Sequence, residues 1–262
     1  MRVHNGKHIG GRTRPVETPE SHPHLFRALA KYMAQPVETP HEFDWAQLSA
    51  TAQADILGND RLGDCTAAGR SHLIEAWTAN AGAPIVLSTD DTVAFYSLST
   101  GYNPTSPETD RGGDEISVLT AWRDRAAHPI AGWVAVDSND ISHVNSACYL
   151  FEGLYLCGFL EGSWCNVNAS GFVWDVGAPQ NPADGHCIVA LGANERGLIV
   201  NSWGLLGTMT WAAVQEFCDP AKGGACFALL SADILNRATL KAPVGLDWDA
   251  LRADVDGLGG AA

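Results

Sequence analysis

The sequence predicts an α+β protein in which a helical lobe precedes an antiparallel β lobe. Between residues 65 and 152, apolar residues recur at the three- and four-residue spacings of helices. After Gly153, short β-like runs are separated by turns rich in Gly, Pro, Asn and Asp. Helices that come first and strands that come second indicate two segregated lobes.

Four helices are predicted in the first lobe. The first begins at Cys65 and carries Leu73, Ile74 and Trp77 on one face. The second follows Ser88, which is a good N-cap because acidic residues occupy the next turn. The third and fourth lie in "DEISVLTAWRDRAA" and "ISHVNSACYLFEG". The second lobe has five predicted strands, in "LYLCGFL", "HCIVALGA", "GLIVNSW", "GTMTWAA" and "ACFALLS".

Three regions follow from these patterns. Residues 1–42 hold five prolines and one short helical candidate, "HLFRALAKYMA", and we expect an extension that wraps the body or docks a partner. The body covers 43–240, with the helical lobe over about 43–152 and the β lobe over about 153–240. Residues 241–262 form a C-terminal tail with one amphipathic helix.

The composition makes several functions improbable. Of 262 residues 46% are hydrophobic, and the formal net charge is −14, so the surface repels nucleic-acid phosphates and anionic lipids. No run reaches the ~18 apolar residues of a spanning helix, and the N-terminus lacks a signal-peptide core, so we expect a soluble protein. The seven cysteines form no CxxC pair, which favours free thiols and predicts neither a metal nor another cofactor. In an oxidising setting, Cys218 and Cys226 are the pair that would close a small loop.

One cysteine, one histidine and one asparagine carry the chemistry. Cys65 stands at a helix start after the turn-forming Gly63, where a thiolate is stabilised if a cationic histidine approaches. Asp64 is the expected N-cap, and its negative charge opposes the thiolate. His186 begins an apolar strand, and the next strand ends at Asn201, which can orient the imidazole from a neighbouring strand.

These segments resemble papain-like cysteine peptidases. "LGDCTAA" is similar to the nucleophile segment of that family, "GHCIVALGA" to its histidine strand, and "NSWG" is its asparagine motif. His186 and Asn201 follow Cys65 by 121 (186 − 65) and 136 (201 − 65) residues, against about 130–150 in the family. The resemblance implies a two-lobed fold with a β-barrel-like second lobe and an active-site cleft between the lobes. It covers roughly residues 43–235.

Carried over residue by residue, the resemblance implies a cysteine-type peptidase that forms a thioester acyl-enzyme. Cys65 is the nucleophile, His186 the general base and acid, and Asn201 the residue that orients it. The oxyanion hole is formed by the Cys65 amide and by Asn59, which stands where the family has glutamine. An asparagine is one methylene shorter, and losing such a donor costs about 3 kcal/mol.

The same resemblance assigns a substrate-binding role to three further residues. Gly112 and Gly113 belong to "TDRGGDEISVLTAW", which resembles the family's glycine-rich turn along the cleft, and they would bind an extended peptide through the backbone. Trp203 would shield the hydrogen bond between His186 and Asn201. The expected partner is a peptide or protein substrate.

The chain also departs from the family, and this keeps other functions open. No propeptide signature precedes the body, and the second Trp-Gly motif after "NSWG" is replaced by "LLGTMTW". The "GND-x-x-GDCT" pattern resembles papain-like proteins of bacteriophages, which implies a cytoplasmic or virion-associated location and a virion or phage-protein partner for the N-terminal extension. One alternative is a non-catalytic papain-fold module. Another is a Cys-His cell-wall amidase, because "GDCTAAG" also resembles the "DCSG" segment of those enzymes.

Overall fold

The computed structural model describes residues 2–4, 7–13 and 39–231. The helix predicted in "HLFRALAKYMA" and the C-terminal tail over 241–262 lie outside the described residues. Of the N-terminal extension, the description covers three short strands and residues 39–42.

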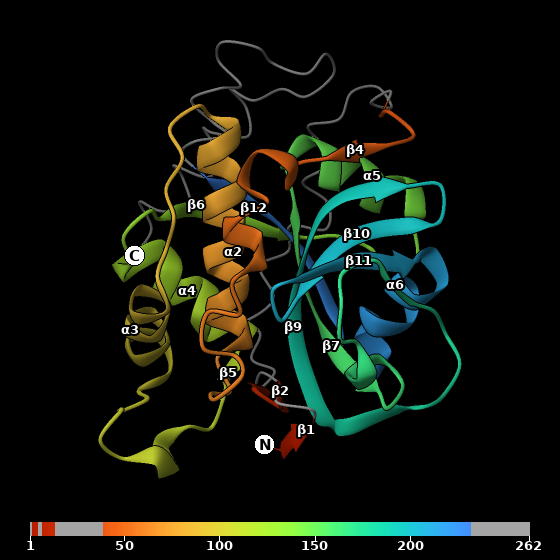
Figure 1. The fold of residues 1–262 in the computed structure, drawn as a ribbon. Helices are drawn as coiled ribbons and strands as arrows, with labels where there is room; N and C mark the ends of the chain where they lie inside the picture. Colours follow the sequence, from red (N-terminus) through yellow and green to blue (C-terminus); the bar gives the residue numbers. More distant parts are fainter. Residues whose placement is uncertain (1, 5–6, 14–38, 232–262) are drawn as a thin grey trace.

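Three helices form one layer of the molecule. The central helix α2 lies between the other two helices and the large sheet (Figure 1). Its N-terminal residue is Cys65, as predicted, and α3 begins after Ser88 with a capping box in which Ser88 and Asp91 each accept a backbone N–H of the other. The bounds are α2 Cys65–Asn80, α3 Thr89–Thr100 and α4 Glu115–Arg125.

Helix α2 is buried on every side, and the prediction of a single apolar face is therefore too narrow. Every residue of α2 except Asn80 is buried. On one side Trp77 stacks on Trp122 of α4, with ring centroids 5.7 Å apart, and the Arg70 guanidinium lies 4.3 Å from the Phe95 ring centroid of α3. On the other side α2 packs against the sheet. A helix that is covered on one side by other helices and on the other side by a sheet needs no polar face.

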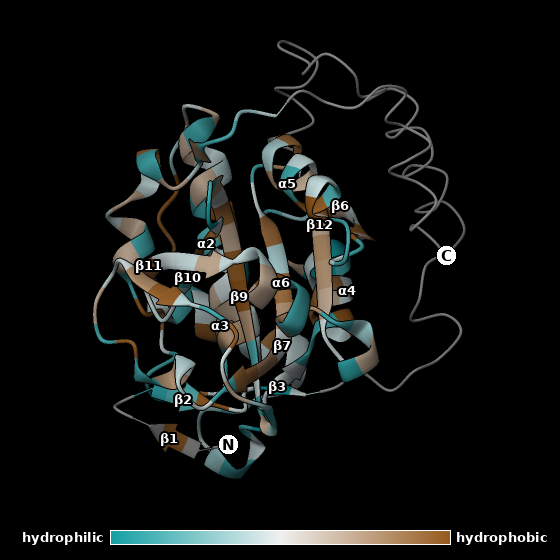
Figure 2. Ribbon diagram, turned by 90° about the vertical axis from the view of Figure 1, so that its right-hand side faces the viewer, coloured by the Kyte–Doolittle hydropathy of each residue, from teal (hydrophilic) through white to brown (hydrophobic). Residues whose placement is uncertain are grey.

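The second layer is an eight-stranded, largely antiparallel sheet. Seven strands follow the order β6-β12-β7-β9-β10-β11-β8, and β4 pairs with β9; among the described strands of this sheet, β11 and β8 pair in parallel and the other pairs are antiparallel. Most residues of the central strands β7 and β9 are buried, and Figure 2 colours much of β9 as hydrophobic. The bounds are β4 Phe43–Asp44, β6 Ile130–Ala135, β7 Leu154–Glu161, β8 Phe172–Trp174, β9 Gln180–Asn194, β10 Gly197–Ser202, β11 Leu205–Thr210 and β12 Ala225–Ser231.

Three features of the sheet layer differ from the sequence analysis. Strand β6 lies between two predicted helices, yet it pairs with β12 and forms the edge of the sheet. The run "GTMTWAA" is divided at Thr210, which ends β11 and caps helix α6 by accepting the Ala213 N–H. Helix α5 contacts β9 of the sheet, as α2 does. The bounds are α5 Ile141–Leu150 and α6 Trp211–Phe217.

Short elements complete the fold. Near the N-terminus, β1 pairs with β2, and β3 pairs in parallel with β5, the strand that immediately precedes α4. The short strands are β1 Arg2–His4, β2 Lys7–Ile9, β3 Arg12–Thr13 and β5 Gly113–Asp114. The 3₁₀ turns are η3 Gln47–Ser49, η4 Ala52–Ala54, η5 Pro107–Thr109, η6 Trp164–Asn166 and η7 Pro220–Lys222.

A hydrogen bond from Tyr155 joins the sheet to the first turn of α2. The Tyr155 hydroxyl donates to the Thr66 carbonyl over 2.8 Å, and both groups are buried. We predict that Tyr155→Phe lowers the free energy of unfolding by about 1 kcal/mol, because one buried hydrogen bond is lost while the ring remains. Urea unfolding followed by circular dichroism measures the change. Tyr102→Phe is the matched control, because no hydrogen bond joins its hydroxyl to another described residue; equal losses in the two variants would contradict the prediction.

Candidate active site

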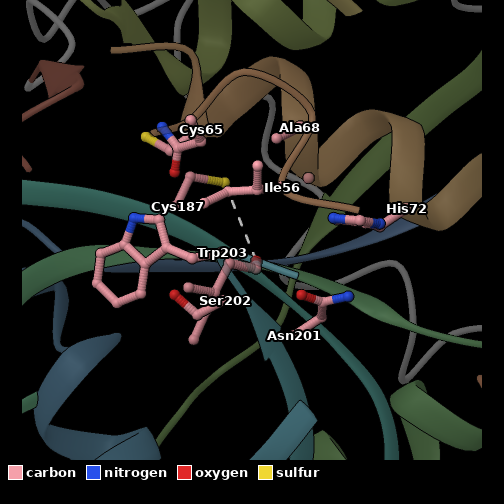
Figure 3. Close-up of a pocket in the computed structure, with 11 residues that line it drawn as sticks. Ile56, Cys65, Ala68, His72, Cys187, Asn201, Ser202 and Trp203 are labelled. Atoms are coloured by element: carbon pink, nitrogen blue, oxygen red, sulfur yellow. Dashed lines mark hydrogen bonds between the residues drawn. The ribbon is translucent and has the colours of Figure 1, made fainter. Parts of the chain in front are cut away.

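Cys65 lies where α2 meets the sheet. Its side chain is 2% exposed, and the backbone N–H groups of Cys187 and Thr66 face its sulfur. Gly69, one turn further along α2, brings the helix close to β9, because a Cβ at this position would lie 3.3 Å from Val189. A small pocket opens beside the sulfur (Figure 3). It is lined by Ile56, Asn59, Cys65, Ala68, Gly69, His72, Cys187, Ile188, Asn201, Ser202 and Trp203.

The Cys65 thiol is neutral in this state. Burial raises its pKa well above the ordinary value, and the neighbouring Cys187 raises it further. The two backbone N–H groups lower the pKa but do not offset the burial. The helix N-terminus alone contributes about 1 kcal/mol or less, so it does not ionise a buried thiol.

Asp64 does not cap the helix as predicted. The Asp64 side chain makes no capping hydrogen bond; instead its Oδ1 accepts from Asn59 Nδ2 over 3.1 Å. Asp64 is fully buried, and its pKa is raised well above the ordinary value, chiefly by burial. The charge of Asp64 also raises the pKa of Cys65, as expected, although the raised pKa of Asp64 itself favours its uncharged form.

Asn59 lines the pocket, but its amide hydrogens are already used. Besides Asp64, Nδ2 donates to the Leu62 carbonyl over 3.1 Å. An amide nitrogen has two hydrogens, so an oxyanion would have to replace one of these two partners. The second expected donor, the Cys65 N–H, is in the first turn of α2, where backbone N–H groups have no partner within the helix.

His186 is buried in β9 and is held by two contacts. Its Nε2 is 2.9 Å from Ser202 Oγ, and its ring stacks on Trp203 with centroids 4.3 Å apart and planes 19° apart. Within the described part of the chain, Nδ1 has no hydrogen-bond partner, and no hydrogen bond joins the ring to Cys65. Burial, and secondarily the charge of Lys7, lowers the pKa of His186 to about 3, so the imidazole is neutral.

No hydrogen bond joins Asn201 to His186, which corrects the expected hydrogen bond. Its Nδ2 donates to the backbone and side-chain oxygens of Gln53, over 2.8 and 2.9 Å. Figure 3 shows the Asn201 amide on the opposite side of the pocket from the Trp203 ring. Consequently the shielding expected of Trp203 applies to the bond between His186 and Ser202.

A β-bulge explains this arrangement. The pairing of β10 with β9 passes over Leu191 between Ile199 and Val200, so Asn201 lies opposite Val189. Residues that lie opposite each other in a sheet point to the same face.

The position of Val189 then decides which side chain meets His186. His186 is three residues from Val189, so the two side chains point to opposite faces. Asn201 shares the face of Val189, whereas Ser202, one residue later, shares the face of His186. Without the bulge, Asn201 would lie on the face of His186.

Residues 7–13 lie between the two layers, against β5 and β9, and we call the region that they occupy the cleft. The Gly113 N–H donates to the Gly11 carbonyl over 2.9 Å, and Arg12 and Thr13 continue the pairing along Gly113 and Asp114. On the other side, the Trp203 indole donates to the His8 carbonyl over 3.3 Å. The segment therefore lies against the three residues predicted to bind substrate.

Glycines let this segment approach closely. A Cβ on Gly112, whose φ is +76°, would lie 2.0 Å from the Gly11 carbonyl oxygen. A Cβ on Gly185, the neighbour of His186, would lie 2.2 Å from the Arg12 carbonyl oxygen. Any larger residue at these two positions would push the segment out of the cleft.

The sequence analysis did not identify four residues that the structure brings to the site. Ser202 lies inside "NSWG", so the motif was the available signal, but its contact with His186 depends on the bulge. Gln53 has no sequence signal, since it belongs to a 3₁₀ turn of small residues. Arg12 and Glu115 are opposite charges 103 positions apart that form a buried ion pair.

Two further observations concern metals and membranes. In the described ranges, no three residues of the types His, Cys, Asp and Glu are grouped in a way that could hold a metal ion. No helix among the described residues is long and apolar enough to cross a membrane.

Comparison with solved structures identifies the fold class as papain-like, as predicted. The chain resembles procathepsin L2 from the larval midgut of Tenebrio molitor, with a TM-score of 0.62 at 16% identity over 86% of this chain and 79% of that chain. It also resembles xylellain, a cysteine protease from Xylella fastidiosa, with a TM-score of 0.60 at 13% identity over 88% of this chain and 100% of that chain. The ragweed pollen allergen Amb a 11, a cysteine protease in its proform, gives 0.54 at 15% identity over 76% and 67%. No family model and no curated protein sequence matches the chain.

The raised pKa of Asp64 gives a testable pH dependence. Because the folded-state pKa lies above the unfolded value, the folded state binds more protons between the two, and stability is lost as the pH rises through the folded pKa. Asparagine cannot ionise and still accepts from Asn59. We predict that Asp64→Asn stabilises the protein increasingly as the pH rises above the ordinary carboxyl range, measured by urea unfolding at a series of pH values. Asp90→Asn, at an exposed position in the first turn of α3, is the control; parallel pH profiles for wild type and Asp64→Asn would contradict the prediction.

Proposed function

We propose that this chain is a cysteine-type peptidase that hydrolyses peptide bonds with Cys65 and His186. One observation supports this most strongly. In a papain-like fold, an extended segment of the chain is bound by its backbone at Gly113, directly between the helix that begins with Cys65 and the strand that carries His186. A cleft that binds one extended backbone beside a thiol can bind another.

The chemistry begins with transfer of the Cys65 proton to Nδ1 of His186, the nitrogen without a partner. The thiolate attacks the substrate carbonyl, and a sulfur–carbon bond forms while the carbonyl oxygen becomes negative. When the carbon–nitrogen bond breaks, His186 donates its proton to the leaving amine. Water, deprotonated by His186, then cleaves the thioester and releases the acid together with the free thiol.

Ser202 is the positioning residue for the imidazole in this proposal. A hydrogen bond at Nε2 fixes the ring orientation and leaves Nδ1 for the thiol. The Cys65 N–H and the Asn59 amide supply the oxyanion hole, Asn59 by exchanging its Leu62 partner for the oxyanion. Asn201 acts through Gln53 on the position of β10, without contact to the imidazole.

Residues 7–13 hold the site in a resting state. Their presence contributes to the burial that raises the pKa of Cys65 and lowers that of His186, and Lys7 adds a positive charge near the imidazole. Departure of the segment brings water to both groups and removes Lys7, so both pKa values move toward the thiolate–imidazolium pair. Two of the structures that the fold resembles, procathepsin L2 and Amb a 11, are likewise of proforms.

The first test is hydrolysis of a fluorogenic peptide library. We predict that Cys65→Ala abolishes turnover and that His186→Ala lowers kcat/KM by about 10²–10⁴-fold, because proton transfer is lost. Ser202→Ala lowers kcat more than Asn201→Ala does, because Ser202 forms a hydrogen bond with the imidazole and Asn201 does not. Cys148→Ala, a buried thiol on α5, is the control and retains turnover. Turnover that persists in Cys65→Ala would refute the proposal.

The second test concerns the resting state. Arg12→Ala removes the buried ion pair that fastens the segment to Glu115, so we predict that iodoacetamide alkylates Cys65 at pH 7 about tenfold faster than in the wild type. Peptide mapping by mass spectrometry identifies the alkylated cysteine. Arg61→Ala, which removes an exposed arginine, is the matched control. Equal rates in wild type and Arg12→Ala would show that the segment does not protect the thiol.

A non-catalytic binding module is the second candidate. It is favoured by the lack of a hydrogen bond between His186 and Cys65 in the described residues and by the engaged Asn59 amide. This candidate predicts that Cys65→Ala binds the same peptides as the wild type and that neither cleaves them. Cell-wall amidase activity and virion or phage association remain predictions; incubation with peptidoglycan, followed by assay of new amino groups, tests the former.

A further inference from the structure

Arg12 fills a closed side-chain pocket beside the candidate active site. Its Nε donates to Glu115 Oε2 over 2.9 Å, and Nη2 donates to Oε1, so the pair is bidentate. The two side chains are 1% and 2% exposed. The guanidinium also lies 5.4 Å from the centroid of the Phe159 ring.

This pocket is part of the cleft rather than a structural contact remote from it. The backbone on either side of the Arg12 side chain touches Gly113 and Gly185, which flank the cleft, and Gly185 precedes His186. Cys157 and Cys187, which lie opposite each other on β7 and β9, are close to the Arg12 guanidinium. A side chain in this pocket is therefore anchored next to the strand that carries the imidazole.

Glu115 determines which chemistry the pocket accepts. It is the first residue of α4, and a buried carboxylate without a cation is strongly disfavoured. Its two oxygens and the facing aromatic ring match a planar guanidinium, which donates two parallel hydrogen bonds and stacks. An ammonium offers a point charge without this geometry, and an aliphatic side chain leaves the carboxylate unpaired.

We propose that this pocket selects an arginine side chain of the substrate and that Glu115 is its specificity-determining residue. In the described state, Arg12 occupies the pocket in place of the substrate arginine. The assignment of the occupant as substrate rests on the peptidase function proposed above. An arginine-containing peptide and Arg12 compete for the same carboxylate, so the substrate side chain that the site prefers is also the one that displaces the segment.

Binding to a catalytically inactive variant tests the proposal directly. The full-length Arg12→Ala/Cys65→Ala protein has a vacant pocket, and its folding is checked by circular dichroism. Fluorescein-labelled alanine-based hexapeptides that differ at one position, with arginine, citrulline, lysine or leucine, are titrated by fluorescence anisotropy. Citrulline is the matched control because it keeps the shape of arginine and loses the charge. We expect the arginine peptide to bind at least about tenfold more tightly than the citrulline and lysine peptides.

Substitution of Glu115 tests whether its carboxylate causes the preference for arginine. Adding Glu115→Gln should reduce the preference for arginine over citrulline to about twofold or less, since the charge-assisted bonds are lost. The comparison of the arginine and citrulline peptides uses protein that retains Glu115. It therefore tests the proposed arginine selectivity even if Glu115→Gln does not fold. Equal affinities for the arginine and citrulline peptides, or no binding of either to the folded vacant protein, would overturn the proposal and leave Arg12–Glu115 as a structural ion pair.

Turnover separates this proposal from the peptidase function. Hydrolysis of leucine and arginine peptides with equal kcat/KM by the Arg12→Ala protein would support a peptidase and overturn the selectivity. Tight, Glu115-dependent binding of the arginine peptide without hydrolysis by the protein that retains Cys65 would refute the peptidase and uphold the pocket as an arginine-binding site.

Discussion

The contact between the first turn of α2 and strand β9 is the constraint on which the site depends. Gly69 allows the helix to approach the sheet, and the Tyr155 hydroxyl fixes the first turn from the neighbouring strand β7. Since α2 is buried between the sheet on one side and helices α3 and α4 on the other, it can neither rotate nor slide without disturbing the packing on both sides. The thiol at its start is thereby held against the backbone of Cys187, one residue after His186. Cys65 and His186, the proposed nucleophile and base, thus come from different layers, and the fold brings their segments together.

The sequence was sufficient for those parts of the fold that depend on local chemistry. The start of α2 after Gly63 and the N-cap at Ser88 depend on adjacent residues, and the structure confirms both predictions. Strand β6 was not predicted because it is a short run between two predicted helices, and its assignment depends on pairing with the distant strand β12. In the site, too, some features depend on adjacent residues and others on the pairing of distant ones. Cys65 and His186 stand in recognisable segments, but the partner of His186 depends on a single extra residue in β9, which no motif reveals.

Burial determines the ionisation of most titratable groups that the preceding sections describe in the cleft, and one pair is the exception. Asp64, Cys65 and His186 are each buried with few groups that favour their charged forms, so the pKa shifts of all three favour neutrality. Arg12 and Glu115 are equally buried, yet their bidentate contact supports both charges: burial lowers the pKa of Arg12, and Glu115 more than restores it. The single ionised pair in this part of the described cleft therefore joins the N-terminal segment to the body.

Under the proposed function, this distribution of charge couples occupancy of the cleft to the reactivity of the thiol. While Arg12 remains paired, burial favours the neutral forms of Cys65 and His186, and the charge of Lys7 adds to the effect at His186. A ligand that displaces Arg12 must bring its own cation to Glu115, because the empty pocket would leave a buried carboxylate unpaired. Because Arg12 and Lys7 belong to one continuous segment, a ligand that displaces Arg12 also moves Lys7 away from the imidazole. Recognition at Glu115 and ionisation at Cys65 are in this way two consequences of one exchange, and a peptide without a basic side chain would achieve neither as readily.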